Sequence, residues 1–515
     1  MMVQEDVQQI SRIAFTYGIE TSVGDDQALW IICCQYLCLM PFFRILCQGL
    51  PNHRDGGGII CSSFYPLICR IEHREIFKES EALFYTRYWN KCAINNVFLF
   101  IVYTWSSGGS SMVFGTLQDV ETKGRTVFVR VDFNSPMDPS SETILDDKRF
   151  REHIPTILAL EDAKVVILTH QSRPGKKDFT SLKAHAEKLE RLIRKPVTYI
   201  DDIIGRSARD SVKTLRSGEV LMLENLRFNA EENLTMKPEE ARKTHLVRML
   251  SEMGDLFVND AFGTAHRSQP TMVGLPMAMK SVAGLLMERE VSMLSKVFSG
   301  APHPITFILG GTKVDDSIAV AEHVLKNEIA DQIIAIGVVG NIFLAASGIE
   351  VGHPSRQLIE SLGYSGEIEK AKQILSSYSD RVAMPESVAV RQDGQRVEYP
   401  VDRIPEDLPI LDLGSGSIQS MVNMIKSQGT IVFNGPAGVF EDPDFAIGTY
   451  ELVRAASTVE FSVVGGGHTA AVIEKMGLES SYSHLSTGGG ACIEFLTGKK
   501  LPAVAALEAS WELYG

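Results

Sequence analysis

The sequence has little cysteine beyond its first quarter, few tryptophans and no excess of positive charge. Its 515 residues include eight cysteines and four tryptophans, and 50 Lys and Arg stand against 64 Asp and Glu, a net charge of −14. Proteins that bind nucleic acid over a broad surface need a basic face, so this balance argues against that class. It still permits a local basic pocket for a small anion. With 44% hydrophobic and 22% charged residues, a wholly disordered chain is also excluded.

The scarcity of cysteine applies to only part of the chain. Seven of the eight cysteines and three of the four tryptophans precede Met112, and only Cys492 follows it. Residues 1–111 carry 8 basic and 10 acidic groups, so the remaining 404 residues hold nearly all of the charge. One cysteine cannot form an internal disulfide, which indicates a reducing, cytoplasmic location for this longer part.

Residues 1–111 show neither helical nor strand periodicity over a long stretch. Their most apolar piece, Ala28–Phe43, is interrupted by Pro41 and falls short of the roughly 17 to 25 residues that span a bilayer. Because the composition changes at a methionine, we interpret residues 1–111 as translated upstream sequence, disordered and dispensable, with the true start at Met112. A membrane anchor and a small folded accessory domain remain as alternatives.

From Gly124 onward, short apolar, β-branched runs alternate with longer amphipathic stretches such as Ser181–Arg194 and Pro238–Met253. This alternation predicts an α/β fold whose parallel sheets are buried on both faces. Ligands bind such sheets at the carboxyl ends of the strands, so the informative residues should follow each run. The expected strands are Thr126–Val131, Val165–Thr169, Val220–Leu223, Leu256–Val258, Thr306–Leu309, Gln332–Gly337, Gly429–Phe433 and Glu460–Val464.

Polar and basic side chains follow the early strands. A single arginine at such a place is equally consistent with a solvated surface, but several at equivalent positions indicate a pocket for a small, multiply charged anion, because the guanidinium fork matches carboxylate and phosphate. The candidate residues are Asp132, Asn134, Arg149, His170, Arg173, Arg227 and Arg267.

The later strands end in glycine-rich loops. Glycine lets backbone N–H groups approach a phosphate, and a helix N-terminus adds a favourable dipole. No GxxxxGK[ST] or GxGxxG pattern fits these loops, which disfavours a P-loop enzyme and a dinucleotide-binding oxidoreductase. The candidate residues are Gly310, Gly311, Lys313, Asn434, Pro436, Glu441, Gly465, Gly466, Gly467 and Thr469. An anion pocket in one half and a phosphate pocket in the other suit phosphoryl transfer between a nucleotide and a small anionic substrate.

Nine segments, in the expected order, resemble the phosphoglycerate kinase family, and two details are similar to its archaeal branch. The segments are RVDFNSP (130–136), DDKRFREHIPTI (146–157), THQSRPGK (169–176), LENLRF (223–228), VNDAFGTAHR (258–267), ILGGTKVDDSI (308–318), FNGPAGVFE (433–441), GGGHTAA (465–471) and SHLSTGGGACIEFLTGKKLPAVAAL (483–507). They cover essentially all of residues 112–515 and none of residues 1–111.

The resemblance implies two Rossmann-like lobes with parallel sheets, joined by a hinge helix across a cleft. Residues 112–284 would form the substrate lobe, 285–299 the interdomain helix and 300–482 the nucleotide lobe, with 483–515 returning to the first lobe. The implied reaction is reversible phosphoryl transfer from 1,3-bisphosphoglycerate to ADP, giving 3-phosphoglycerate and ATP, with Mg²⁺.

The resemblance also implies individual roles. The seven residues of the anion pocket would hold 3-phosphoglycerate, and the residues of the glycine-rich loops would hold the nucleotide. Arg149, Lys313, Gly466 and Gly467 would act in catalysis. We expect in-line transfer on domain closure, a monomer or small homo-oligomer, and no nucleic-acid or membrane partner.

Two departures from the common family pattern concern the nucleotide site. Ser317 stands where many members carry a second lysine, and His468 where many carry an aspartate that contributes to metal binding. Both changes are similar to the archaeal branch, so we do not interpret them as loss of activity. No role is assigned to either residue, and the protein ligands of a metal stay undefined. A non-catalytic ligand-binding relative is the alternative, but Arg149 and Lys313 are both present, which argues against it.

Overall fold

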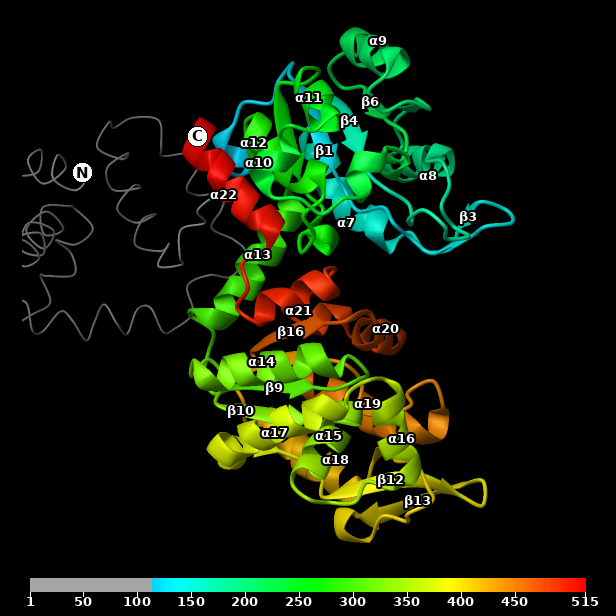
Figure 1. Cartoon of the computed structure of the whole chain (residues 1–515), viewed down its shortest axis with the longest axis vertical. Helices are drawn as coiled ribbons and strands as arrows, with labels where there is room; N and C mark the ends of the chain where they lie inside the picture. The colour runs from blue at the N-terminus through cyan, green and yellow to red at the C-terminus, as the bar shows by residue number, and fades with distance from the viewer. Residues whose placement is uncertain (1–113) are drawn as a thin grey trace, which may run out of the picture. The chain divides into compact units, whose positions relative to one another are not determined.

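The computed structural model describes residues 114–515, which are coloured in Figure 1. The hypotheses about residues 1–111, including a membrane anchor at Ala28–Phe43, therefore lie outside the described residues. Among residues 114–515, no helix combines the length and apolar character needed to cross a membrane.

The first sheet has six parallel strands in the order β5-β6-β4-β1-β7-β8. β1 lies in the middle, and its residues are buried on both faces, which explains the continuous apolar run in the sequence. The strands are β1 (Thr126–Arg130), β4 (Lys164–Leu168), β5 (Val197–Tyr199), β6 (Val220–Met222), β7 (Leu256–Asn259) and β8 (Ser281–Ala283). A small antiparallel hairpin, β2 (Met137–Asp138) with β3 (Thr143–Ile144), follows β1.

Helices cover both faces of the first sheet. Val127 and Val129 point to one face, where they pack with side chains of α7 and α8, and Phe128 points to the other, where α9, α11 and α12 pack. The helices of this half are α7 (Lys148–Ala159), α8 (Lys183–Ile193), α9 (Arg206–Thr214), α10 (Pro238–Ala241), α11 (His245–Ser251) and α12 (Leu275–Ala278).

The second sheet also has six parallel strands, in the order β11-β10-β9-β15-β16-β17. These are β9 (Ile305–Leu309), β10 (Gln332–Ala335), β11 (Val382–Ala383), β15 (Thr430–Asn434), β16 (Phe461–Gly465) and β17 (His484–Leu485). A separate antiparallel sheet contains β12 (Ser387–Gln392), β13 (Gln395–Pro400) and β14 (Asp412–Leu413).

The second sheet is likewise covered on both faces. One core, around Ile431 and Phe433, includes side chains of α18, α19 and α20, and the other, around Phe307 and Val432, includes α13, α14, α15, α17 and α21. The helices are α14 (Val314–Lys326), α15 (Gly337–Ala346), α16 (His353–Ser361), α17 (Ser365–Tyr378), α18 (Ser415–Lys426), α19 (Ile447–Ala456), α20 (Gly467–Met476), α21 (Gly490–Leu496) and α22 (Pro502–Tyr514).

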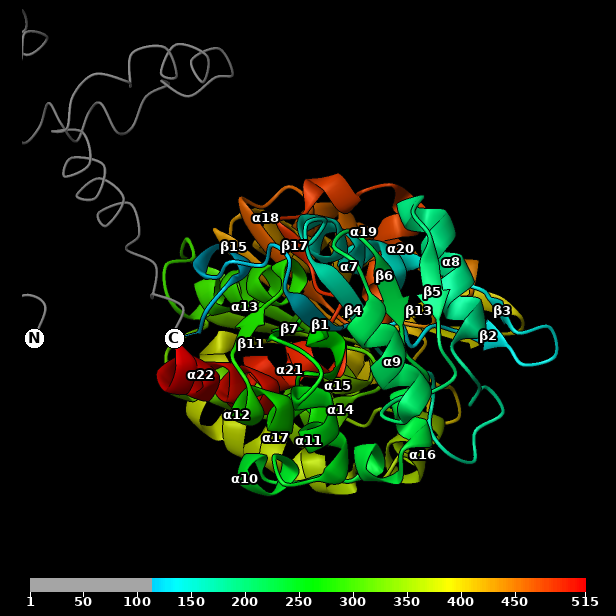
Figure 2. The same ribbon diagram turned by 90° about the horizontal axis from the view of Figure 1, so that it is seen from above.

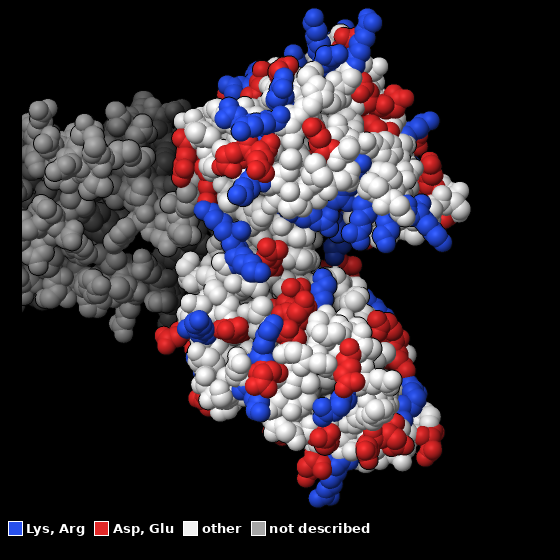
Figure 3. All heavy atoms as spheres, in the orientation of Figure 1, with Lys and Arg blue, Asp and Glu red and all other residues white. Residues whose placement is uncertain are grey.

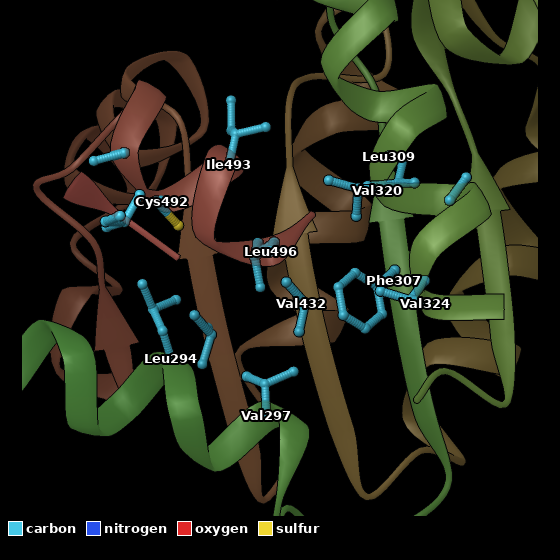
Figure 4. Close-up of a cluster of buried hydrophobic side chains, with 14 of the residues drawn as sticks. Leu294, Val297, Phe307, Leu309, Val320, Val324, Val432, Cys492, Ile493 and Leu496 are labelled. Atoms are coloured by element: carbon cyan, nitrogen blue, oxygen red, sulfur yellow. The ribbon is translucent and has the colours of Figure 1, made fainter. Parts of the chain in front are cut away.

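The two sheets are connected through α13 (Leu285–Phe298). Figure 4 shows side chains of α13 pointing, together with Phe307 of β9, Val432 of β15 and Leu496 of α21, into one core. The buried carboxylate of Glu290 on α13 accepts hydrogen bonds from His484 Nε2 (2.7 Å), Ser486 Oγ (2.8 Å) and the Thr487 backbone N–H (2.6 Å). The chain after β16 is thereby fixed to the connecting helix.

The C-terminal helix returns to the first sheet. α22 packs against β8 and α12, and Figures 1 and 2 both place it beside α12. The segment predicted to return, 483–515, begins inside the second sheet, because β17 pairs with β16. The part of this segment that packs on the first sheet is α22.

The predicted α/β fold with two parallel sheets and a connecting helix is confirmed, and each of the eight expected strands is present within a residue or two. The stretch Pro238–Met253 differs, because it forms two short helices. Thr244 separates them, and its hydroxyl accepts a hydrogen bond from the Val247 N–H to cap α11. The end of the run Gln332–Gly337 is also different, since Gly337 begins α15.

Glu290 gives a testable prediction about stability. Burial opposes its ionisation, but bonds from His484 and Thr487 outweigh this and hold its pKa below the ordinary 4.5. A carboxylate whose pKa falls on folding stabilises the protein above the unfolded pKa, and this contribution disappears as the pH drops through the folded pKa. Glu290→Gln should therefore lower the free energy of unfolding near pH 7 by about 2 kcal/mol. In urea titrations, its deficit relative to wild type should shrink as the pH falls below 4.5. A deficit independent of pH would contradict this.

Candidate active site

The predicted anion pocket lies where the strands of the first sheet end together. Arg130, near the end of β1, is in register with Leu168 of β4 on one side and Asn259 of β7 on the other. The chain order of the strands reverses direction at β1, and ligands of such sheets bind at this kind of switch point. The residues that follow these strands therefore project from one edge of the sheet.

Asp132 and Arg149 form an ion pair at this edge. The Arg149 guanidinium, on the first turn of α7, donates to Asp132 Oδ2, and its side chain remains 41% exposed. The backbone N–H of Asn134 donates to Asp132 Oδ1 at 3.2 Å. Burial of Asp132 favours its neutral form, but the charge of Arg149 outweighs this and keeps the pKa of Asp132 below its ordinary value. Asp132 is thus an anion that orients a partly exposed cation.

Arg130 was not predicted as a site residue, yet it lies beneath the pocket with 1% of its surface exposed. Its Nε donates to Thr271 Oγ1 at 3.2 Å, and its Nη2 lies 3.7 Å from Glu232 Oε1. Glu232 also accepts from the hydroxyl and the N–H of Thr271, at 2.5 and 3.0 Å. An arginine inside a buried strand must be paired, and this was the signal in the sequence that could have identified it.

His170 contacts Arg130 directly, and this contact defines its protonation. Arg130 Nη2 lies 3.3 Å from His170 Nδ1. A guanidinium can only donate, so Nδ1 accepts and the proton of the neutral ring resides on Nε2. Burial and the neighbouring arginines lower the pKa of His170 well below 6.5, although Asp132 acts in the opposite direction. Within the described residues, His170 Nε2 is buried without a hydrogen-bond partner, which leaves a donor for a ligand.

Arg227 and Asn134 are held by the same loop after β4. The Arg227 guanidinium donates to the carbonyl oxygen of Ser172, and the N–H of Ser172 donates to Asn134 Oδ1 at 2.8 Å. Burial and the charges of Arg267 and Arg130 lower the pKa of Arg227 to about 10. Arg173, in contrast, is exposed on this loop. Arg267 acts electrostatically on both His170 and Arg227, so the structure brings six of the seven predicted residues together, and the exposed Arg173 is the exception.

The pocket carries more positive than negative charge. Four arginines are close enough to shift the pKa values of groups in this pocket: Arg130, Arg149, Arg227 and Arg267. The acids that act on the same groups are Asp132 and Glu232. Like charges in a partly buried site repel, so the arrangement is stabilised by an anionic ligand. Figure 3 shows Lys and Arg side chains gathered near α7 and the β2–β3 hairpin.

The glycine-rich loops meet at the corresponding edge of the second sheet. Asn434 at the end of β15 is in register with Leu309 of β9 and with Gly465 of β16. The three loops therefore begin at one level of the sheet. The chain order again changes direction between β9 and β15, which gives this sheet a switch point of its own.

Two of these loops touch through their backbones. Gly435 has a φ of 89°, and a Cβ atom on it would overlap the carbonyl group of Gly310. Gly310 N–H donates to Asn434 O at 2.8 Å, and Gly435 N–H donates to Thr469 Oγ1 at 3.0 Å. Gly310 is therefore bonded directly to Asn434, and Thr469 is bonded to Gly435, the residue that follows Asn434.

Helix N-termini surround this contact. Lys313 precedes α14 and is exposed, and Gly466, with a φ of 87°, precedes α20. Pro436 accepts a hydrogen bond from Gly311 N–H at 2.9 Å. Gly337, at the start of α15, was not predicted as a site residue; a Cβ on it would lie 2.7 Å from Pro436 O. A glycine at the end of an apolar run was the available signal for it.

The remaining residues of these segments differ in their exposure. Glu441 is exposed, in the loop before a short 3₁₀ turn. His468 is exposed, with its ring 5.6 Å from that of Phe440, whereas Ser317 is buried in the first turn of α14. Over residues 114–515, no group of three or more His, Cys, Asp or Glu side chains is placed to hold a metal ion.

The contact between the two loops gives a prediction about glycine. Gly435→Ala should lower the free energy of unfolding by about 2 kcal/mol or more, because it adds a left-handed backbone penalty to the overlap with Gly310. Gly467→Ala is the matched control, since Gly467 has open space around its Cβ direction and begins α20; it should change stability by less than about 0.5 kcal/mol. Thermal unfolding of both variants tests this, and equal stabilities would show that the two loops tolerate a side chain at their contact.

Comparison with known proteins agrees with this geometry. The family model described as phosphoglycerate kinase matches residues 117–499. A phosphoglycerate kinase of Methanocorpusculum labreanum is 67% identical over 404 residues, covering 78% of this chain and 100% of the relative. One from Methanothermobacter thermautotrophicus is 48% identical over 403 residues, covering 78% and 98%.

Solved structures lead to the same family. The crystal structure of phosphoglycerate kinase from Pyrococcus horikoshii OT3 matches with a TM-score of 0.72 at 41% identity, covering 78% of this chain and 100% of that one. The enzyme from Coxiella burnetii matches with a TM-score of 0.66 at 31% identity, covering 77% and 100%. The expected resemblance, including that to archaeal members, is therefore confirmed, and the chain belongs to the phosphoglycerate kinase family.

Proposed function

We propose that the first-sheet pocket binds 3-phosphoglycerate, that the glycine-rich loops bind ATP or ADP, and that phosphoryl transfer between them is direct. The overall reaction is that of the family: 1,3-bisphosphoglycerate and ADP give 3-phosphoglycerate and ATP, reversibly. The observation that carries the proposal is the surplus of buried guanidinium charge at the edge of the first sheet. A small substrate with a carboxylate and a phosphate supplies the missing negative charge.

The pocket can distinguish the parts of such a substrate. Arg227, Arg267 and Arg173 present forks suited to a phosphate, which accepts several N–H groups at once. The neutral His170 ring offers its Nε2–H as a directional donor without adding another charge. Asp132 is an acceptor for a substrate hydroxyl, and Asn134, already oriented by Ser172, lies beside it.

The nucleotide would be held mainly by backbone groups. The loops of Gly310–Gly311 and Gly465–Gly467 expose N–H groups near the N-termini of α14 and α20, where a phosphate is favoured by the helix dipole. Lys313 adds a point charge for the outer phosphates. We assign Asn434, Pro436 and Glu441 to the rest of the nucleotide, with Glu441 on the ribose.

Transfer requires little covalent chemistry from the protein. An acyl phosphate is a good donor and a carboxylate a competent acceptor, so no enzyme intermediate or strong base is needed. Arg149 combines partial exposure with fixation by Asp132, which suits a cation that meets the charge of the moving phosphoryl group. The N-terminus of α20 at Gly466 and Gly467 would act on the same charge from the nucleotide side.

Mg²⁺ enters this proposal as part of the nucleotide substrate. Mg²⁺ retains several waters and is commonly bound through substrate phosphates. His468, at the position of the common aspartate, is no preferred ligand for it. By binding the nucleotide phosphates, Mg²⁺ would neutralise part of their negative charge beside Lys313.

The separate roles of the cationic side chains can be tested by steady-state kinetics in the ATP-consuming direction. Arg149→Ala should reduce kcat by about 10³-fold or more with small changes in either KM, because its contact strengthens only as charge spreads in the transition state. Lys313→Ala should reduce kcat and also raise the KM for ATP, whose phosphates are already present in the ground state. Arg227→Ala is the comparison: it should raise the KM for 3-phosphoglycerate about tenfold or more. If Arg149→Ala keeps kcat within a few-fold, the assigned mechanism is wrong.

We also propose that residues 112–284 and 300–482 act as the substrate and nucleotide lobes around the helix 285–299, with 483–515 completing them, and that residues 1–111 are dispensable. The family match begins at residue 117, and the Methanocorpusculum relative is covered completely by a 404-residue alignment. A cytoplasmic location is consistent with a single cysteine in this part and with nucleotide substrates.

Deletion of residues 1–111 tests this proposal. The shortened protein should keep kcat and both KM values within about twofold, because no predicted site residue precedes Asp132. The full chain, purified and assayed in parallel, is the control. Loss of most activity in the shortened protein would favour an accessory domain over upstream sequence.

A further inference from the structure

His153 is a buried histidine that the reaction as described does not use. It lies on α7, one turn after Arg149, and is 2% exposed. Its Nε2 accepts a hydrogen bond from the backbone N–H of Asp132 at 3.0 Å. Its Nδ1 lies 2.7 Å from Asp260 Oδ2. The imidazole therefore connects a residue of the substrate pocket to a second carboxylate deeper in the protein.

The hydrogen bonds fix the direction of this connection. A backbone N–H can only donate, so His153 Nε2 must be the unprotonated nitrogen. Nδ1 then carries the proton and donates it to Asp260. The opposite tautomer would place two donors face to face at Asp132. A neutral histidine thus satisfies both neighbours in one orientation of the ring, and Asp260 selects the tautomer that does so.

Asp260 in turn holds the beginning of the connecting helix. Its Oδ1 accepts from the N–H groups of Leu286 and Met287, at 2.9 and 3.4 Å. The residue that precedes α13 is Gly284, which has no side chain to cap the helix, and a Cβ atom there would overlap Asp260 Oδ1. A carboxylate at this end is favoured by both the free N–H groups and the helix dipole.

One turn further along α13, Glu290 ties the helix to the second sheet. Glu290 accepts the hydrogen bonds of His484, Ser486 and Thr487 described above. A continuous set of hydrogen bonds therefore runs from Asp132 through His153 and Asp260 to α13, and α13 is itself bonded to the chain that follows β16. We call the Asp132–His153–Asp260 part of this set the relay.

We propose that His153 is a positioning residue, and that the relay couples 3-phosphoglycerate binding at Asp132 to the N-terminus of α13. The inference rests on the assignment of 3-phosphoglycerate to the Asp132 pocket. Substrate that engages Asp132 and Arg149 displaces or stiffens the backbone at Asp132, and the hydrogen bond to His153 Nε2 transmits this to Asp260. The Leu286 and Met287 N–H groups, which Asp260 caps, report the result.

α7 and α13 are also joined by contacts outside the relay, which provide a control. Thr156 Oγ1, on α7, accepts from the Leu285 N–H at 2.9 Å, and Glu152 on α7 pairs with Arg289 on α13. Thr156→Val removes one capping bond at the same helix end without touching the relay. Comparing Thr156→Val with variants of the relay therefore distinguishes a general loosening of α7 and α13 from an interruption of the relay.

Two substitutions break one bond of the relay each. His153→Asn keeps an amide donor near the position of Nδ1, facing Asp260, but removes the acceptor for the Asp132 N–H. Asp260→Asn keeps an oxygen for the Leu286 and Met287 N–H groups, but it can turn an NH₂ group toward the proton on His153 Nδ1. Both variants preserve the cap of α13 and the side chains that contact substrate.

Amide hydrogen exchange with and without saturating 3-phosphoglycerate is the test, on the full chain. In wild type, 3-phosphoglycerate should slow exchange at Asp132–Asn134, where it binds. It should also slow exchange at Leu286 and Met287, by about fivefold or more, which is the lower end of typical coupling between two sites. In His153→Asn and Asp260→Asn, 3-phosphoglycerate should still slow exchange at Asp132–Asn134 but should change Leu286 and Met287 less than about twofold. Thr156→Val should speed exchange at Leu285 and keep the wild-type response at Leu286 and Met287.

Three results would overturn the proposal. Undiminished responses at Leu286 and Met287 in both relay variants would mean that coupling does not pass through His153. An equal loss of the response in Thr156→Val would mean that the coupling arises from general packing of α7 on α13. Failure of 3-phosphoglycerate to slow exchange at Asp132–Asn134 in wild type would refute the substrate pocket itself, an outcome distinct from the other two. Circular dichroism of each variant confirms that the exchange data refer to folded protein.

Discussion

The first half of the protein depends on a guanidinium placed inside a sheet. Arg130 occupies a strand position that is otherwise apolar, and it is kept there by Glu232, Thr271 and His170. A buried charge is tolerated only when it is paired and hydrogen-bonded. This requirement brings segments from three distant parts of the chain to one edge of the sheet. It also defines the tautomer of His170 and contributes to the lowered pKa of Arg227.

The anion sites that we propose in the two halves are of opposite construction. The first uses long side chains whose charges are balanced incompletely by Asp132 and Glu232. The second uses backbone N–H groups exposed by glycine, with Lys313 as an added charge near the contact between Gly310 and Gly435. Side-chain charges suit a substrate recognised by its own charge pattern. Backbone groups suit phosphates that arrive with a metal ion and need shape more than charge.

The elements that could be predicted from the sequence are those whose residues form a local pattern. Strands such as β1 and β15 are continuous apolar runs, and the residues after them are close together because parallel strands end at one edge. Strands of two residues, such as β11 and β17, are too short to show a period and were not predicted. Glu232 and Asp260 were not assigned roles, since their importance arises from partners far away in the chain. The split of Pro238–Met253 into two helices depends on the Thr244 cap, which competes with a continuous apolar pattern.

The return of α22 to the first sheet means that the chain crosses between the two halves twice, once through α13 and once between α21 and α22. A body attached at one point can swivel in every direction, but one attached at two points turns most freely about the line that joins them. The double crossing therefore restricts relative movement of the halves toward a single axis. It also means that neither half is one uninterrupted stretch of sequence, so cutting the chain at α13 would separate the first sheet from the helix that covers β8.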